Sequence, residues 1–490
     1  MFGFEGDNAR EKGIVLLTMC FALAMAMLDN TVVNVALPSI QADLEIGLSE
    51  LEWIVAGYAL TFAALMLTGG KVADAYGRRL VFVVGIAVFT LASLFCGLAD
   101  SGEMLIAARI LQGVGAALMN PATLSIIAAT FPPAQRGAAI GIWAGVSALA
   151  LAIGPLVGGL IAEHLTWSWI FFVNVPVGIA GIAASFLLID ESKDETHERL
   201  DIPGLATSGI GLFALTYALI EANSYGWTSA RILGAFALAG LALLAFVLLE
   251  RHQHAPMLPL DLFANRTYTG ANVVILLVAL AMFGVFFFVS LYMQNILGYS
   301  PVQAGAAFLP MTVLIILVAP IAGKTSDRVG SRWLMTTGMT LLAVQLLLFS
   351  RLGEDASYWE LLPALMIGGI GMAMTMTPSA AAATRSVPVE KSGVGAAVLN
   401  AFRQVGGSLG IAVMGAIMAA QLDGERTPDA FLAGFEKALV VAAGIAFLGA
   451  VVSAVLVRSH HPSAPAVPTP ADQPAPDSAT KSKFRPQPST

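Results

Sequence analysis

Charged residues are scarce in this sequence, in which only 12% of the 490 residues are Asp, Glu, Lys or Arg. Soluble globular proteins carry about 25%. Hydrophobic residues reach 57%, so the composition indicates a chain that is dissolved largely in lipid. The 25 Lys and Arg residues form no basic stripe of the kind that a nucleic-acid-binding surface needs, and the net charge of -7 says little about partners.

Cysteine is almost absent and histidine is rare, which excludes several kinds of site. The two cysteines, Cys20 and Cys96, both lie inside apolar runs, so they predict neither a disulfide framework nor a metal site. The six histidines lie in loops or near helix ends. The sequence holds no P-loop and no nucleophile motif, so we expect neither an enzyme nor a bound cofactor.

We expect no cleavable signal peptide. A signal peptide has an apolar region of about 7–15 residues, whereas the first apolar run here continues from Gly13 to Leu37. Because a spanning helix needs about 20 apolar residues, we interpret this run as an uncleaved first membrane helix.

Long apolar runs, by contrast, are abundant along the whole chain. They predict an all-α polytopic membrane protein with fourteen transmembrane helices. The expected helices cover residues 14–37, 53–70, 80–99, 104–129, 138–162, 169–189, 203–221, 231–249, 270–293, 302–323, 333–350, 361–383, 393–419 and 434–457.

The basic residues orient these helices, because short loops on the cytoplasmic side of a membrane are enriched in Lys and Arg. With a cytoplasmic N-terminus, 19 of the 25 basic residues fall in cytoplasmic segments and four fall outside. The remaining two, Arg109 and Arg403, fall within spans. We therefore expect a multi-pass protein of the cytoplasmic (inner) membrane with both termini in the cytoplasm.

One ten-residue segment occurs twice. Residues 70–79 (GKVADAYGRR) follow the second predicted helix, and residues 323–332 (GKTSDRVGSR) follow the tenth. A looser echo links residues 113–115 (GVG) with residues 369–371 (GIG). Because two related halves are a common transporter plan, we expect two pseudo-symmetric six-helix bundles plus two inserted central helices.

The repeat and the polar segments divide the chain. We expect a cytoplasmic N-terminus (1–13), an N-terminal six-helix bundle (14–189), a cytoplasmic linker (190–202), the inserted helix pair (203–249), a cytoplasmic loop (250–269), a C-terminal six-helix bundle (270–457) and a disordered cytoplasmic tail (458–490). The tail is rich in Pro, Ala, Ser and Thr and lacks the apolar surface that folding requires.

Five motifs in chain order carry a resemblance to a known family. They are LDNTVVNVALP (28–38), the Gly-rich basic loop (70–79), RILQG (109–113), GPLVGG (154–159) and WIFFVNVP (169–176). With them, residues 14–457 resemble the major facilitator superfamily, and within it the fourteen-helix drug:proton antiporter branch. The resemblance implies export of small lipophilic or cationic compounds in exchange for protons, by alternating access.

Asp29 is the residue expected to carry the proton. It lies fifteen residues into the first predicted helix, about 22 Å along its axis, where a carboxylate costs at least about 2.5 kcal/mol to insert. We therefore expect it to face a partner or a cavity, with Arg109 of the fourth helix as the partner. The alternatives are that Asp29 caps a broken helix and that Arg109 extends to the headgroups.

Two polar stripes are expected to line a central cavity, one on the fourth helix and one on the thirteenth. Aromatic and Met side chains crowd the ninth helix, where they line the cavity or face lipid. The complete expected lining set is Asn34, Gln112, Asn120, Phe286, Tyr292, Gln294, Asn400, Arg403 and Gln404.

The repeated Gly-rich loops are expected to gate this cavity. The resemblance implies that the first loop reaches the other half and locks the cytoplasmic side when the cavity faces outward, with a weaker role for the second. Glycines permit close approach and the charges can pair with a helix end. The expected gating residues are Gly70, Asp74, Gly77, Arg78, Asp327 and Arg328. The alternative is a simple positive anchor.

Small residues make the fifth predicted helix narrow. Gly145, Gly154, Gly158 and Gly159 permit close helix contact, and Pro155 bends the helix. The resemblance associates this motif with antiport, and a dry contact with the other half would block a proton leak. Ordinary helix packing is the alternative.

Three functions remain open from the sequence. The first is proton-coupled drug efflux, the second is export of one endogenous metabolite by the same fold, and the third, a remote one, is a membrane receptor or enzyme. We expect small-molecule substrates, protons and the lipid bilayer as partners, no nucleic acid, a monomer, and the proton as coupling ion with no other cofactor.

Overall fold

The chain is helical throughout the part that the computed structural model describes, which is residues 9–193, 200–253, 256–388, 391–422 and 427–458. Thirteen helices in this part are long and apolar enough to cross a membrane, or fourteen when the two parts of a bent helix count as one span. The predicted all-α membrane fold is therefore confirmed. The expected disordered tail, from residue 459, and part of the expected linker lie outside the described residues.

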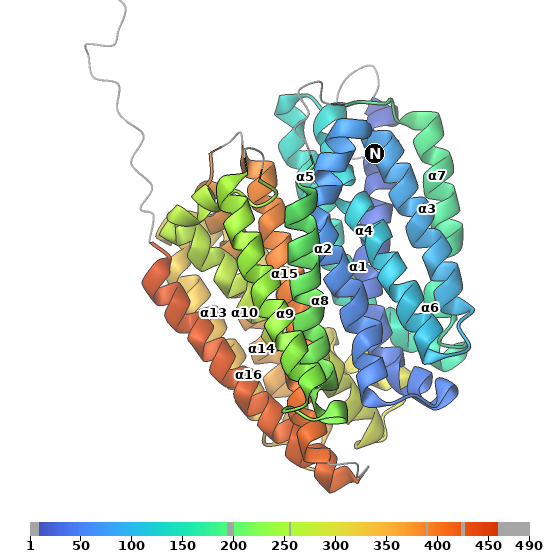
Figure 1. The fold of residues 1–490 in the computed structure, drawn as a ribbon, viewed down its shortest axis with the longest axis vertical. Coiled ribbons are helices and arrows are strands. Elements are labelled where there is room, and N and C mark those ends of the chain that lie inside the picture. Colours follow the sequence, from blue (N-terminus) through green and yellow to red (C-terminus); the bar gives the residue numbers. More distant parts are fainter. Residues whose placement is uncertain (1–8, 194–199, 254–255, 389–390, 423–426, 459–490) are drawn as a thin grey trace, which may run out of the picture.

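The first half of the molecule contains the first seven helices (Figure 1). They are α1 (Ala9–Leu44), α2 (Leu48–Tyr76), α3 (Arg78–Gly97), α4 (Gly102–Thr130), α5 (Pro133–His164), α6 (Trp169–Phe172) and α7 (Asn174–Leu188). The short α6 and the following α7 form one span, and the bent α5 forms another. This half thus has the six spans that the sequence predicted.

The second half has the same number of spans. Its elements are η1 (Leu260–Ala264), α10 (Arg266–Asn295), α11 (Pro301–Ala307), α12 (Leu309–Val329), α13 (Ser331–Phe349), α14 (Tyr358–Arg385), α15 (Ser392–Leu422) and α16 (Pro428–Leu456). Here α11 and α12 together form one span. The described ends of the chain both lie in the upper part of Figure 1, toward the same side of the molecule. We call this side the Ala9 face, and the opposite side, where α1 ends, the Leu44 face.

The inserted pair, α8 (Ile202–Tyr225) and α9 (Ala230–His252), covers one seam between the halves. Helix α8 packs against both α2 and α15, and α9 packs on α8 (Figure 1). Two hydrogen bonds hold α8 near its end: Asn223 Nδ2 donates to the Ala416 carbonyl at 2.8 Å, and Trp53 Nε1 donates to Glu221 at 3.2 Å. The pair therefore contacts both halves without belonging to either bundle.

Glycines place α4 and α14 in equivalent positions within their halves. A β-carbon on Gly113 would lie 2.7 Å from the Tyr58 carbonyl oxygen of α2, and one on Gly369 would lie 2.5 Å from the Met311 carbonyl oxygen of α12. Two residues further along each helix, a β-carbon on Gly115 would clash with α3, and one on Gly371 would clash with α13. The loose repeat of residues 113–115 and 369–371 therefore reflects a real structural pseudo-symmetry.

Helix α2 begins earlier than the sequence pattern predicted. The expected helix covered residues 53–70, whereas the structure has Leu48–Tyr76. The Glu50 carboxylate accepts a 2.6 Å hydrogen bond from the Gly47 backbone N–H, which stabilises the extra first turn. As a consequence Glu52, placed in a loop by the pattern, lies inside the helix and is 2% exposed.

The close approach of α3 and α4 gives a prediction for stability. In Gly115→Ala the new β-carbon would lie 2.5 Å from the Phe89 backbone nitrogen, so the helices must separate. We expect a loss of about 1–3 kcal/mol, measured as a lower midpoint of thermal unfolding in detergent. Gly444→Ala is the control, because no atom lies within 4 Å of that position and alanine favours helix. Equal midpoints for both variants would contradict the packing account.

Candidate functional site

Asp29 and Arg109 form an ion pair in the interior of the first half. Arg109 Nη1 donates to Asp29 Oδ2, and the two side chains are 0% (Arg109) and 1% (Asp29) exposed. Arg109 Nε also donates to the Ile54 carbonyl at 3.0 Å, and its guanidinium lies 4.3 Å from the centre of the Tyr58 ring. The expected pairing is thus present, and Arg109 does not extend to the headgroups.

Gln112 forms hydrogen bonds to both members of this ion pair and does not line the cavity, which corrects the expectation. Its Nε2 donates to Asp29 Oδ1 at 2.9 Å and to Ser93 Oγ at 2.8 Å, while its Oε1 accepts from Arg109 at 2.6 Å. The physical reason is the three-residue spacing from Arg109, which puts both side chains on the face of α4 that meets α1. The three side chains, Asp29, Arg109 and Gln112, are called the polar cluster below.

A cavity of about 370 Å³ lies between the two halves. It is lined by α1, α5, α10, α12, α14 and α15, with one residue from α4. Six of the nine expected lining residues are part of it: Asn34, Asn120, Phe286, Asn400, Arg403 and Gln404. Its apolar lining includes Met27, Trp143, Phe283, Met311, Met372 and Met376.

Tyr292 and Gln294 were also expected in the lining, and the structure places them elsewhere. Tyr292 stacks on Phe435 with 4.9 Å between ring centres, and its hydroxyl donates to the Gly353 carbonyl at 2.6 Å. Gln294 Nε2 donates to the Val35 carbonyl at 2.9 Å. Both residues lie near the end of α10, beyond the level at which this helix borders the cavity.

The cavity extends toward the Ala9 face and is closed at the Leu44 face. Exposed Thr384, at the end of α14, belongs to its lining. At the opposite face the halves are in contact, because Glu163 of α5 accepts hydrogen bonds from Ser300 Oγ at 2.5 Å and from the Val302 N–H at 2.9 Å. A guest can therefore reach the cavity from the Ala9 face.

The glycine motif of α5 contributes to this closure. Gly159 lies against the backbone of Pro301, and Gly305 lies against the backbone of Pro155, so α5 and α11 touch across the halves. Gly154 and Gly158 instead pack against Thr31 and Val32 of α1. Most of the motif therefore makes the tight contacts that the sequence predicted.

Two details of α5 refine that prediction. A β-carbon on Gly145 would have no atom within 4 Å, so Gly145 takes no part in the contact between α5 and its neighbours. Pro155 lacks the N–H that would bond to the Leu151 carbonyl, and Thr31 Oγ1 of α1 donates to that carbonyl at 3.3 Å. The bend in α5 is thereby tied to the helix that carries Asp29.

The first Gly-rich loop is held by its own half. Asp74 accepts a 2.9 Å bond from Arg78 Nε, and Gly77 has a φ of 120°, which favours glycine. The backbone N–H groups of Arg79 and Leu80 both donate to the Glu191 carboxylate at 3.1 Å. Among the described residues, Asp74, Gly77 and Arg78 make no hydrogen bond or ion pair with the other half, which fits a cavity that extends toward this same face.

The start of this loop contacts the connection to the second half. Lys71 Nζ donates to the Pro256 carbonyl at 3.1 Å, and Thr68 Oγ1 lies 3.2 Å from the sulfur of Met257. A β-carbon on Gly70 would lie 3.5 Å from the Cβ atom of Pro121 in α4, an ordinary contact distance. The loop therefore links α2 to the segment that follows the inserted pair.

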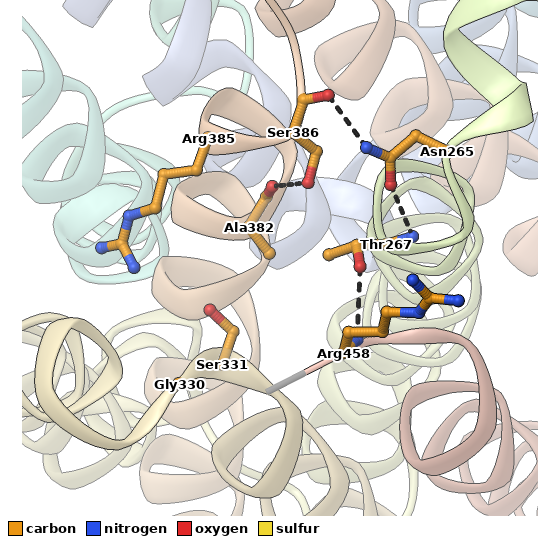
Figure 2. Close-up of a pocket in the computed structure, with 8 residues that line it drawn as sticks. All are labelled: Asn265, Thr267, Gly330, Ser331, Ala382, Arg385, Ser386 and Arg458. Atoms are coloured by element: carbon orange, nitrogen blue, oxygen red, sulfur yellow. Dashed lines mark hydrogen bonds between the residues drawn. The ribbon is translucent and has the colours of Figure 1, made fainter. Parts of the chain in front are cut away.

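The second Gly-rich loop is likewise tied within its half. Asp327 pairs with Arg385 of α14, Gly330 has a φ of 87°, and Arg328 is exposed and forms no ion pair with any described residue. Figure 2 shows the pocket of about 230 Å³ beside this loop, where Asn265 Nδ2 donates to the Ser386 carbonyl at 3.2 Å. This pocket lies wholly within the second half.

A further bond joins the loop before α10 to the start of α15. Lys391 Nζ donates to Asp261 Oδ2 at 2.7 Å, and this hydrogen bond holds the pKa of the Asp261 carboxyl below its usual range. Both side chains are largely exposed, so the bond contributes little to stability.

Glu52 is a buried carboxyl that the sequence interpretation missed. It lies against Gly415 of α15, near Glu221 of α8, and pairs with no basic group of the described residues. The signal that could have found it is the Gly47–Glu50 spacing, because a glutamate three residues after the cap position marks a helix start upstream of Glu52.

The polar cluster gives a second stability prediction. Removing one partner of a buried ion pair costs about 3–5 kcal/mol, because the other charge stays unpaired in the interior. We expect Asp29→Ala and Arg109→Met each to lower the thermal unfolding midpoint of the purified protein. The double variant should lose less than the sum of the two single losses. Strictly additive losses would show that the two side chains do not stabilise each other.

Comparison with known proteins identifies the family. The profile of the Major Facilitator Superfamily matches residues 19–264 and 271–489. The puromycin resistance protein of Streptomyces alboniger is 38% identical over 92% of each chain, and the tetracenomycin C resistance and export protein of Streptomyces glaucescens is 36% identical over 84% of this chain and 77% of its own. A bacterial homologue of the lysosomal transporter Spinster, in an inward-facing and unoccupied conformation, has the same fold, with a TM-score of 0.65 at 16% identity and coverage of 92% and 98%. This chain belongs to the Major Facilitator Superfamily.

Proposed function

We propose that this protein exports small drug-like compounds through the cytoplasmic membrane in exchange for protons, by alternating access. The observation that carries the proposal is the position of the polar cluster, an ion pair buried beside a cavity that reaches one face of the membrane. Relatives that are 36–38% identical over the aligned residues are named as antibiotic resistance or export proteins, which supports the class of substrate. Membership of a transporter family favours a transporter over an enzyme.

Helix α1 provides the physical link between proton and guest. Its Asp29 points to Arg109 of α4, whereas its next polar residues, Asn30, Thr31 and Asn34, line the cavity. Protonation of Asp29 removes its charge, so the ion pair with Arg109 is lost and α1 can shift relative to α4. Because Thr31 also holds α5, such a shift would act on the contact that closes the Leu44 face.

We further propose that the Ala9 face is cytoplasmic and that the protein acts as a monomer with the proton as its coupling ion. The excess of Lys and Arg in segments at this face supports the orientation. In this orientation the structure corresponds to the state that receives guests from the cytoplasm, and closure of the cavity at the Ala9 face would accompany release outside.

Proton coupling is tested with Asp29→Asn. We expect efflux of a transported drug from energised vesicles to fall by about tenfold or more, because an asparagine at this position cannot take up or release a proton. Asp355→Asn is the control, since this exposed carboxyl lies in a loop and should leave transport unchanged. Full transport by Asp29→Asn would refute the proposal.

The orientation is tested with single cysteines, because both native cysteines are buried. Tyr76 at the Ala9 face is 64% exposed and Trp359 at the Leu44 face is 76% exposed. In intact spheroplasts we expect a membrane-impermeant maleimide to label Trp359→Cys and to label Tyr76→Cys only after lysis. The opposite pattern would reverse the proposed orientation.

A further inference from the structure

Arg403 sets the charge of the central cavity. It is the one formally charged side chain among the described residues that line the cavity, and Asp, Glu, Lys and His are all missing from that set. Asp29 does not join the lining, because Arg109 and Gln112 hold its carboxylate inside the first half. A guest in the cavity therefore meets a positive charge and no negative one.

Arg403 also has no partner of its own. No described residue forms a hydrogen bond or an ion pair with its guanidinium. Arg109, the other arginine inside the spans, is by contrast paired with Asp29 and bonded to a carbonyl. An unpaired cation in a low-dielectric site is costly, so an anion that enters the cavity offsets that cost.

The neighbouring residue on α15 offers a second vacant donor. Gln404 is 1% exposed, lines the cavity, and has no acceptor for its Nε2 among the described residues. Both groups belong to the lining of one cavity, and a guanidinium and an amide N–H are donors that suit the oxygens of a carboxylate. The rest of the lining is largely apolar and rich in Met, which can adapt to an extended or aromatic body.

The geometry points to lipophilic organic anions as the preferred guests, with the carboxylate or another singly charged acidic group bound by Arg403 and Gln404. This inference names the substrate class of the proposed exporter and rests on that function. The family resemblance implied lipophilic or cationic guests. The charge of the cavity instead favours acids with an apolar body. In a purely structural role, Arg403 would instead stabilise the fold and show no preference between guests of different charge.

Equilibrium binding to the purified full chain in nanodiscs tests the inference. The probes are 1-pyrenebutyrate, its carboxamide and 1-pyrenebutylamine, which share one ring system and differ in charge. Energy transfer from tryptophan to pyrene reports binding, with empty nanodiscs as background. We expect the carboxylate to bind at least about tenfold more tightly than the amide or the amine, as a charged hydrogen bond allows.

Substitutions assign this preference to Arg403. Arg403→Gln should weaken binding of the carboxylate about tenfold and change that of the amide by less than about twofold, while Arg403→Lys should keep most of the preference. Arg351→Gln, which removes an exposed loop cation, is the matched control and should change nothing.

Equal or tighter binding of the amine by the wild type would overturn the inference, as would an equal loss for all three probes in Arg403→Gln. If Arg403→Gln does not fold, binding of the three probes to the wild type and to Arg403→Lys still tests the charge preference. Binding at equilibrium needs no proton gradient, so failure here leaves proton coupling through Asp29 standing, and normal transport by Asp29→Asn would leave the charge preference standing.

Discussion

The structure depends on one constraint, that the charge of Asp29, buried inside the first half, needs a partner. Asp29 meets it through Arg109 and Gln112, and these three side chains fix where α1 and α4 lie relative to each other. Because Asp29 is engaged there, the same helix presents amides and a hydroxyl to the cavity in its place. The polar cluster therefore decides both the packing of the first half and the charge that a guest encounters.

The two arginines inside the spans have opposite surroundings. Arg109 is buried, paired with Asp29 and packed against the Tyr58 ring, whereas Arg403 lines the cavity and pairs with no described residue. The halves are in contact through α5 and α11 on one seam, at the Leu44 face, and through α8 on the other. In this arrangement a change in the charge of Asp29 can shift α1, and through α1 it can shift α5 and the cavity lining. The proton and the guest then influence each other without direct contact.

The fold and the ion pair could be predicted from the sequence, whereas part of the site could not. Asp29 and Arg109 were predictable because two opposite charges inside spans each need a partner. Gln112 was misplaced because helical spacing defines a face and not the neighbour which that face meets. Tyr292 and Gln294 were misplaced because the apolar pattern gives no depth along α10, and Glu52 was missed because helix starts depend on capping contacts.

The central claim is that Asp29 exchanges its proton in response to the guest. It is tested most directly by measuring proton release, with a pH-sensitive dye in weakly buffered solution, when a transported drug is added to the purified protein. The account predicts that the wild type releases protons and that Asp29→Asn releases none. Equal proton release by both proteins would contradict it.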